Sequence, residues 1–468
     1  MADKQYQTMS GVKTVKRTVL LICVILCFML PGCQIMGFDT EDTLRPPRAT
    51  GDQADIQKVL EQEEGGDITL RYPQRGDYRS AIVMEDINAD GQQEAIAFYR
   101  SNKTNDVTMN MMVIGKPGGI WQNLGKFVCP NGMESVDKVL FSDLDGDGTK
   151  EILVGWTGSV NASVNQLTGY RYQDGAVKEL SVNYTYSEVL AEDFNRDGCS
   201  EIFLASLKTA SQDPETNERV EIDANARIIQ MDQKTGQLIN ISVVQLDPNV
   251  TRYASVIADE ISPGRMAVVI DGYQERSMLT EVVYWDEKAG SLRSPFSSSE
   301  GGNPTVRPTT AWVSRDFDGD GIVEIPTMEL MPGYTSESQD PTYVTSWWRF
   351  NPETERPDIF VYDMVTNSAG RYCFRLPEEW RDHVTASLDT ATQTLTFYEW
   401  KGAQGVALLH IQVFSSKEWE AGQETEGFVK MYEHNDGRVI AANTPNPDNP
   451  YTLTYQEIKE NLMLISNL

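Results

Sequence analysis

Histidine, cysteine and basic side chains are scarce in this sequence of 468 residues. Its 40 lysines and arginines stand against 69 aspartates and glutamates, which gives a formal net charge of −29 at pH 7. Binding to nucleic acid requires clustered positive charge that neutralises phosphates, and anionic surfaces repel a chain of this charge. We therefore exclude nucleic acid as a partner and expect divalent cations instead.

Sequence signatures of common catalytic sites are also missing. The chain has no serine-nucleophile motif, no zinc-binding helix motif and no glycine-rich phosphate loop. Its three histidines are His383, His410 and His434, and His410 lies in an apolar strand pattern that is typical of a packed side chain. These observations predict a protein that is not an enzyme.

The cysteines give neither a disulfide framework nor a zinc site. Beyond Cys33 only Cys129, Cys199 and Cys373 remain, and none of them is spaced as a CxxC pair. A single bridge, such as one between Cys129 and Cys373, stays an open alternative at this point.

Long apolar runs are limited to the amino terminus. The segment Val19–Leu30 follows three basic residues and is uncharged. It is shorter than the roughly 20 residues of a membrane-spanning helix, as is typical of a signal peptide. Its end, Leu30-Pro-Gly-Cys33, resembles the lipobox of bacterial lipoproteins, although that family usually has alanine or serine where Pro31 lies. The resemblance implies acylation of Cys33 and a lipid anchor on the extracytoplasmic face of the bacterial cell membrane. The alternatives are an ordinary secretory signal and a short buried helix that happens to end in Gly-Cys.

One nine-residue pattern returns four times in the exported part of the chain. It reads Asp-x-Asp/Asn-x-Asp-Gly-x-x-Glu, and the copies start at residues 86, 143, 193 and 316. Short runs rich in β-branched or aromatic residues precede and follow every copy, which predicts a strand on each side. The preceding runs are Ala81–Met84, Val139–Phe141, Val189–Ala191 and Ala311–Val313, and the following runs are Ala95–Tyr99, Ile152–Trp156, Ile202–Ala205 and Ile325–Met328.

The pattern has the chemistry of a calcium loop. Calcium takes six to eight oxygen ligands, and side chains at positions 1, 3 and 5 of a tight turn converge on one point. Glycine at position 6 permits the turn, the backbone carbonyl at position 7 adds a ligand, and the acid at position 9 closes the shell. We expect up to four structural Ca²⁺ ions. The candidate ligands are Asp86, Asn88, Asp90, Gln92 and Glu94; Asp143, Asp145, Asp147, Thr149 and Glu151; Asp193, Asn195, Asp197, Cys199 and Glu201; and Asp316, Asp318, Asp320, Ile322 and Glu324.

A fifth unit without these ligands lies between the third and fourth copies, whose starts are about twice as far apart as the others. Tyr253–Ile270 keeps the order of strand, loop and strand, but Ser262 and Pro263 occupy ligand positions. The units also continue into two further strands, as the hairpin-turn sequences Gln173–Gly175 and Lys234–Gly236 indicate.

Four strands in a unit of about 50 residues are typical of a β-propeller blade. The acidic pattern between strands resembles the FG-GAP or VCBS repeat, the calcium-loop blade that is also found in integrin α-chain propellers. The resemblance implies a mainly β fold, with a β-propeller of about five or more four-stranded blades over residues 66–361. Residues 1–32 are expected to be the lipoprotein signal peptide, and residues 33–65 the lipid anchor and tether.

The pattern changes in residues 362–468, for which we expect a small α+β domain. Thr454 and Glu457 form the capping-box pattern of a helix whose apolar spacing extends through Ile465. Two strands are also expected, at Thr394–Trp400 and Ala407–Phe414. An additional blade followed by a helix is the alternative for this segment.

Neither location nor architecture identifies a ligand. We expect a non-catalytic binding or adhesion module at the cell surface, with an extracellular protein or glycan as partner besides the membrane. Trp347 and Trp348 are neighbours in a predicted strand and face opposite ways, so we expect one ring to be exposed and available for stacking on a sugar. The alternatives are a lyase-like, polysaccharide-active enzyme on a calcium propeller, or an envelope scaffold. No oligomeric state is predicted.

Overall fold

The computed structural model describes residues 51–66, 68–101, 108–158, 164–212, 219–296, 302–309, 311–422 and 425–465. The predicted signal peptide, the lipobox with Cys33 and the start of the tether lie outside the described residues. The chain divides into two compact units, residues 1–60 and 61–468. Of the first unit the structure describes residues 51–60, which include the start of helix α3 (Asp52–Glu64). Within the described ranges, no helix is long and apolar enough to cross a membrane.

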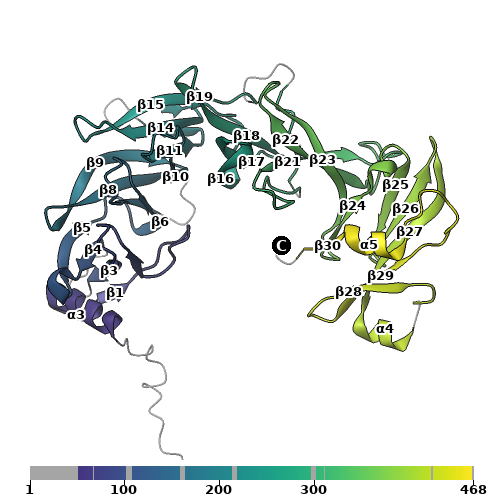
Figure 1. Cartoon of the computed structure of the whole chain (residues 1–468), viewed down its shortest axis with the longest axis horizontal. Helices are drawn as coiled ribbons and strands as arrows, with labels where there is room; N and C mark the ends of the chain where they lie inside the picture. Colours follow the sequence, from purple (N-terminus) through teal and green to yellow (C-terminus); the bar gives the residue numbers. More distant parts are fainter. Residues whose placement is uncertain are drawn as a thin grey trace, which may run out of the picture. The chain divides into compact units, whose positions relative to one another are not determined.

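The second unit consists mainly of antiparallel sheets, which confirms the prediction of a mainly β protein (Figure 1). The first sheet contains β1 (Ile68–Leu70), β2 (Ile82–Glu85), β3 (Glu94–Ser101), β4 (Met109–Gly115) and β5 (Gln122–Val128). The second contains β6 (Ser135–Ser142), β7 (Glu151–Thr157), β8 (Asn165–Gln173) and β9 (Ala176–Tyr186). The third contains β10 (Glu188–Glu192), β11 (Glu201–Ser206), β14 (Asn225–Met231) and β15 (Leu238–Gln245), with a separate hairpin of β12 (Thr209–Gln212) and β13 (Arg219–Ile222).

Three further sheets follow, each with five strands. The fourth contains β16 (Arg252–Ser262), β17 (Arg265–Tyr273), β18 (Ser277–Asp286), β19 (Ser291–Arg293) and β20 (Arg307–Pro308). The fifth contains β21 (Glu324–Leu330), β22 (Tyr343–Asn351), β23 (Arg356–Asn367), β24 (Tyr372–Leu376) and β30 (Leu462–Leu464). The sixth contains β25 (Val384–Asp389), β26 (Thr394–Trp400), β27 (Gln404–Ser415), β28 (Val429–Glu433) and β29 (Arg438–Asn443). The short helices are η1 (Pro117–Gly119), η2 (Glu378–Trp380), α4 (Ser416–Ala421) and α5 (Tyr455–Asn461).

Strand β7 is buried along its whole length because it packs on two apolar clusters. Ile152 lies in the cluster that the first and second sheets share, whereas its neighbour Leu153 lies in the cluster that the second and third sheets share. Phe98 of β3 meets Trp156 of β7 edge to face, with ring centroids 6.1 Å apart. A strand with both faces buried needs apolar residues at every position, which explains the continuous apolar run after the acidic pattern.

The same arrangement recurs along the later sheets. Each neighbouring pair shares an apolar cluster to which both sheets contribute buried side chains. Representative pairs are Phe203 and Val268 for the third and fourth sheets, Val269 and Ile325 for the fourth and fifth, and Phe374 and Phe397 for the fifth and sixth. The core of this unit is therefore a series of clusters between sheets rather than one central cluster.

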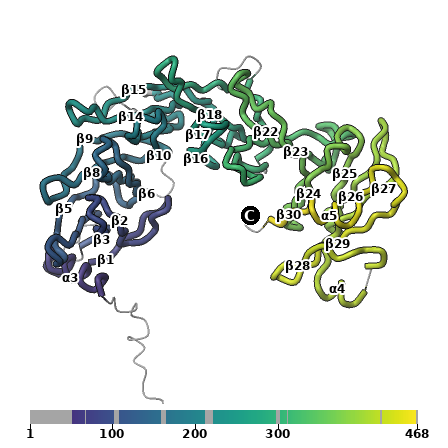
Figure 2. Tube along the Cα trace, in the orientation of Figure 1, coloured from purple at the N-terminus to yellow at the C-terminus, as the bar shows by residue number. Residues whose placement is uncertain are grey.

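Two-residue turns join strands where the sequence predicted hairpins. Asp174 and Gly175 both have positive φ, 54° and 81°, as the tight turn between β8 and β9 requires. Strands β16 and β17 lie side by side (Figure 2). Pro263 and Gly264 connect them, and Gly264 has a φ of 71°. The repeat without calcium ligands, Tyr253–Ile270, therefore forms its hairpin. It has a two-residue turn where the other four repeats have an acidic loop.

The strand predicted at Ala311–Val313 is wrong. Of the described residues in this segment, only Arg315 makes a β-bridge, to Glu324. The Nε atom of Arg307 donates a hydrogen bond to the carbonyl oxygen of Trp312 at 3.1 Å, so a side chain engages the carbonyl that a strand partner would need. Side-chain contacts rather than a ladder hold this segment against the fifth sheet.

At the carboxyl terminus, the two predicted strands are confirmed as β26 and as part of β27. The predicted capping box is confirmed as well, since the hydroxyl of Thr454 accepts the backbone N–H of Glu457. The helix ends at Asn461, so its predicted extension through Ile465 is wrong. Residues Leu462–Leu464 pair with β24 instead, because joining the sheet satisfies their backbone groups and covers its edge. Residue 362, where we expected a new domain, lies inside β23.

Candidate functional site

The four acidic patterns form loops, each of which ends at the first residue of a strand. The glutamate at position 9 is buried in every loop and accepts a hydrogen bond from the backbone N–H at position 2, over 2.8–3.2 Å. The bonded pairs are Ile87 and Glu94, Leu144 and Glu151, Phe194 and Glu201, and Phe317 and Glu324. One carboxylate oxygen therefore ties the end of each loop to its start, and the second oxygen faces the loop side chains.

Backbone N–H groups also orient the carboxylates at positions 1 and 5. The first accepts from the glycine at position 6 at 2.9–3.0 Å, and the second accepts from position 7 at 2.8–3.0 Å. The glycines at position 6 have φ between 84° and 91°, a conformation that favours glycine. Position 4 is left-handed as well, with φ between 58° and 81°, which the sequence reasoning missed. The residues at position 4 are Ala89, Gly146, Arg196 and Gly319.

In the second and fourth loops, carboxylate oxygens lie close enough together to share one cation. Two triads have oxygens within 4.8 Å of one another: Asp143, Asp145 and Glu151, and Asp316, Asp318 and Asp320. Oxygens that surround one calcium ion at about 2.3–2.6 Å lie at most about this far apart. In the first loop, Oδ1 of Asp86 is buried without a hydrogen-bond partner, which fits a cation as its partner. The residues present therefore fit a divalent cation.

Two of the loops already hold a positive side chain. Arg171 of β8 contacts Asp145 and donates to Glu151 at 3.0 Å. Arg349 of β22 bonds three carboxylates of the fourth loop, over 2.6–3.1 Å. Each guanidinium comes from the strand that pairs with the strand after the loop, so the contact depends on sheet register rather than on local sequence.

In the first and third loops, neutral side-chain amides rather than a guanidinium donate to the glutamate at position 9. The Nδ2 atom of Asn88 donates to Glu94 at 3.1 Å, and that of Asn195 donates to Glu201 at 2.8 Å. Gln230, on the strand that pairs with β11, donates to Glu201 at 3.3 Å. These two loops therefore have acidic ligands without a positive side chain among the contacts described.

The pKa values of the position-9 glutamates follow this difference. Burial raises the pKa of Glu94 and that of Glu201 to about 7, and repulsion from neighbouring aspartates adds to the effect. Burial also raises the pKa of Glu151 and that of Glu324, but there the guanidinium opposes the rise.

A polar pocket lies outside the loops, among the first strands of the second, third and fourth sheets and the segment before β2. Its volume is about 550 Å³, which is in the range of ligand pockets. Polar side chains from separate elements line it, including Arg75, Asp137, Asn165, Ser187, Glu188 and Tyr253.

One guanidinium joins two buried carboxylates in this pocket. Arg75 donates to the two oxygens of Asp137 at 2.7 and 2.8 Å, and to Glu188 at 2.6 Å. Asp137 also accepts from the hydroxyl of Tyr186 at 2.7 Å, and Glu188 contacts the ammonium of Lys138. The hydrogen bond to Asp137 is the main cause that raises the pKa of Arg75.

Other polar atoms of the pocket have unused hydrogen-bonding capacity. Oδ1 of Asn165, a residue that is 3% exposed, and the hydroxyl of Tyr253 are buried without a partner. Burial raises the pKa of Tyr253, so its phenol stays protonated and able to donate. Glu281 is close enough to Tyr253 to add to that rise, and burial raises the pKa of Glu281 itself to about 8. A Cβ at Gly155 would lie 1.8 Å from the Tyr186 hydroxyl, so only glycine leaves room for the bond to Asp137.

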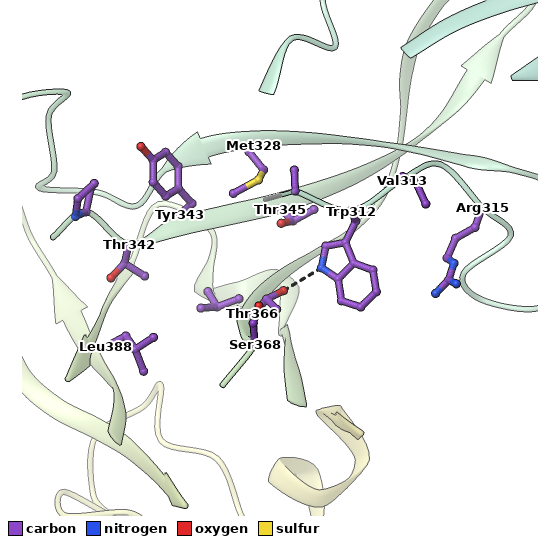
Figure 3. Close-up of a pocket in the computed structure, with 13 residues that line it drawn as sticks. Trp312, Val313, Arg315, Met328, Thr342, Tyr343, Thr345, Thr366, Ser368 and Leu388 are labelled. Atoms are coloured by element: carbon purple, nitrogen blue, oxygen red, sulfur yellow. Dashed lines mark hydrogen bonds between the residues drawn. The ribbon is translucent and has the colours of Figure 1, made fainter. Parts of the chain in front are cut away.

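A second pocket, of about 420 Å³, lies along the fifth sheet (Figure 3). Trp312, Tyr343 and Leu388 line it, and Arg315 is its one charged lining residue. The indole N–H of Trp312 is already donated to Thr366 at 3.0 Å, the bond drawn in Figure 3. This pocket brings no pair of acids together, so acid–base chemistry is better served by the polar pocket.

Other residues that the sequence singled out have structural contacts. His410 is half-buried, its Nδ1 lies 2.9 Å from the hydroxyl of Thr396, and burial lowers its pKa. Trp347 is fully buried, whereas Trp348 is half-buried with its N–H donated to Thr327, so sugar stacking on Trp348 stays a prediction. Trp348 also meets Phe360 edge to face, with ring centroids 5.4 Å apart.

The disulfide that we left open is not formed. The thiol of Cys129 donates to the carbonyl of Met133 at 3.3 Å, and that of Cys373 lies 3.7 Å from the hydroxyl of Thr366. Cys199 contributes position 7 of the third loop and keeps its thiol too.

No family model and no curated protein matches this chain. Among solved structures, an exotype rhamnogalacturonan lyase is 12% identical, with 78% of this chain and 85% of the lyase covered and a TM-score of 0.29. An exo-β-1,3-galactanase from Clostridium thermocellum is 9% identical, with 85% and 99% covered and a TM-score of 0.25. A β-fructofuranosidase from Bombyx mori is 12% identical, with 76% and 74% covered and a TM-score of 0.27. The chain spans 59% of the length of a hypothetical selenium-binding protein from Sulfolobus tokodaii, at 10% identity and a TM-score of 0.27.

The prediction that the protein is not an enzyme is withdrawn, because it depended on the absence of local motifs and the fold brings Arg75, Asp137 and Glu188 together from separate elements. Motif reasoning looks for catalytic groups at fixed local spacing. Arg75, however, is 62 residues from Asp137 and 113 residues from Glu188. The available signal was weak: Asp137 and Lys138 interrupt an otherwise apolar strand.

Proposed function

We propose that this chain is an exported polysaccharide-active enzyme whose substrate site is the polar pocket around Asp137 and Glu188. The observation that carries the proposal is the convergence of two buried carboxylates, the guanidinium of Arg75 and unpartnered atoms of Asn165 and Tyr253 in one cavity. Buried polar atoms without partners cost free energy. A sugar ring offers hydroxyl donors and acceptors that would complete these hydrogen bonds.

The pocket has groups suited to glycoside hydrolysis, which commonly uses a pair of carboxyl groups beside the scissile bond. Asp137 and Glu188 lie on different strands, β6 and β10, and are the candidate catalytic carboxylates. Tyr253 is the candidate proton donor, since burial keeps its phenol protonated. The guanidiniums of Arg75 and Arg252 balance the two carboxylates that line the pocket, so a neutral polysaccharide is the substrate class that fits best.

The proposal also includes a lipid anchor at Cys33 and a β-propeller whose acidic loops bind calcium. The orphaned Oδ1 of Asp86 and the clustered loop carboxylates support calcium. The loop side chains are used for the turn and for coordination, so the ions are assigned a structural role. Calcium would supply the positive charge that keeps three or four carboxylates together in each loop.

The test is turnover on a panel of neutral and acidic polysaccharides, with calcium present. We expect new reducing ends from a neutral polymer, and a loss of about 100-fold or more in kcat/KM for Asp137→Asn and for Glu188→Gln. Tyr253→Phe removes one hydroxyl and should lower kcat more than it changes KM. Asp174→Asn, an exposed substitution in the β8–β9 turn, is the matched control and should leave turnover unchanged.

Two results would contradict the assignment of this pocket: no product from any polymer, or full activity in both carboxylate variants. Unsaturated products from an acidic polymer would show that the reaction is elimination rather than hydrolysis. They would also overturn the assignment of a neutral substrate.

A further inference from the structure

The four acidic loops differ in charge, and the difference is matched by one position on the neighbouring strand. The second and fourth loops have aspartate at position 3 and contain four carboxylates each, whereas the first and third have asparagine there and contain three. The residue opposite the position-9 glutamate in the sheet is arginine for the loops with four carboxylates. It is glycine or glutamine for the loops with three. Arg349 pairs directly with Glu324, whereas Gly115, Arg171 and Gln230 lie one residue beyond the last ladder pair, next to Glu94, Glu151 and Glu201.

We propose that Arg171 and Arg349 are built-in cations that compete with calcium, so that the second and fourth loops bind the ion more weakly than the first and third. This inference rests on the calcium loops of the proposed function and is independent of the polysaccharide site. It divides the four loops into a pair whose ligand oxygens are free of arginine and a pair in which an arginine occupies some of them.

The contacts of the arginines support direct competition. Arg349 bonds Asp318, Asp320 and Glu324, which are the side chains at positions 3, 5 and 9. Arg171 contacts Asp145 and Glu151, at positions 3 and 9. A calcium ion in these loops would need the same oxygens, and two positive groups on one set of oxygens repel each other.

The first loop cannot be neutralised in this way. A Cβ at Gly115 would lie 2.5 Å from Cδ1 of Leu124 and 3.3 Å from Cγ of Glu94, so no side chain fits opposite the glutamate. The orphaned Oδ1 of Asp86 lies in this same loop. In the third loop the opposing Gln230 donates hydrogen bonds but brings no charge.

Hydrogen exchange measured by mass spectrometry over a calcium titration resolves the loops in one molecule. Peptides that cover residues 86–94, 143–151, 193–201 and 316–324 each give a midpoint of protection. We expect the first and third loops to be protected at calcium concentrations about 10-fold or more below those of the second and fourth. Arg171→Gln should move the midpoint of the second loop alone to lower calcium, and Arg349→Gln should do so for the fourth loop alone.

Arg356→Gln removes the same charge at an exposed position of β23 and is the matched control, which should shift no midpoint. The converse double variant, Asn195→Asp with Gln230→Arg, should move the third loop to higher calcium, and it carries the test if Arg171→Gln does not fold. Midpoints that stay within twofold in the arginine variants, or that move to higher calcium, overturn the proposal. A wild-type protein in which no loop responds to calcium overturns it too.

Discussion

The third and fourth sheets pair their first two strands in the same antiparallel way but connect them differently. Between β10 and β11 the chain makes an acidic loop that ends at the buried Glu201, whereas between β16 and β17 it turns over Pro263 and Gly264. Both sheets pack through the same apolar cluster, so the connection is not what fixes their core. What differs is where each sheet keeps its charged groups.

The fourth sheet keeps its charges inside. Arg307 and Asp271 are 2% and 1% exposed, and Nη2 of Arg307 lies 2.5 Å from Oδ1 of Asp271. Asp271 also accepts the backbone N–H of Ser314 at 2.7 Å, which ties the segment before the fifth sheet to β17. In our proposal the acidic loops take a cation from solution, whereas this sheet uses a cation that is part of the chain. Arg171 and Arg349 are intermediate between these two cases, because they are part of the chain but contact the carboxylates of acidic loops.

Among the tests of this comparison, removing calcium should change the stability of the protein most. At a free calcium concentration of about 100 times the Kd, one bound ion stabilises the folded state by about 2.7 kcal/mol. Two such loops therefore contribute about 5 kcal/mol. We expect EDTA to lower Tm and to speed hydrogen exchange in residues 86–94 and 193–201, while the Pro263–Gly264 hairpin exchanges as before. Calcium added back in excess is the control and should restore both. An unchanged melting curve in EDTA would exclude structural calcium.

Breaking the internal pair should have the next largest effect, and calcium should not reverse it. Arg307→Met leaves Asp271 as a buried charge without its partner, which typically costs about 3–5 kcal/mol. Urea unfolding with and without calcium should show the same loss in both conditions. Arg356→Gln should show none. A loss of unfolding free energy below about 1 kcal/mol, or one that added calcium reverses, would contradict this role. It would mean that the Arg307–Asp271 pair does not stabilise the fourth sheet in the way proposed for calcium in the acidic loops.

This comparison also marks what could be predicted from the sequence. The acidic loops were found because their ligands lie within nine residues, and the β16–β17 hairpin was found because its apolar runs flank Pro263 and Gly264. Asp271 and Arg307 are 36 residues apart and meet only because β20 pairs with β18. Such pairs have no local signal, since the register of the sheet creates them.

The candidate pocket shows the same limit. Strand content could be predicted because alternation and turn residues are local, but the partners of Arg75 come from β6 and β10. The carboxyl-terminal error has a related cause: apolar spacing through Ile465 suits a helix, and the free edge of β24 captured Leu462–Leu464 instead. Contacts between segments that are distant in the sequence determine both the pocket and the carboxyl-terminal strand. A short window of sequence therefore carries no signal for either.

The smallest of the expected effects depends on pH and lies in the fourth sheet. Glu281 of β18 is 1% exposed, accepts the backbone N–H of Asp247 at 3.0 Å, and has an Oε2 without a partner. Burial raises its pKa from 4.5 to about 8, with Asp247 adding to the rise. The folded protein therefore holds a proton that the unfolded chain releases. This contribution to stability is complete below about pH 4.5 and is lost as the pH rises through about 8.

Glu281→Gln keeps the acceptor for Asp247 and cannot ionise, so it should escape this loss. Between about pH 5.5 and pH 8 the variant should gain up to about 3 kcal/mol of stability relative to the wild type, at about 1.4 kcal/mol for each pH unit. Urea unfolding across this range measures the difference, and the exposed Glu179→Gln is the matched control. A variant that differs from the wild type by the same amount at every pH would show that Glu281 is already ionised. Since Glu281 lies close to Tyr253, turnover lost above pH 8 in the wild type and kept in Glu281→Gln would link this buried proton to the polar pocket.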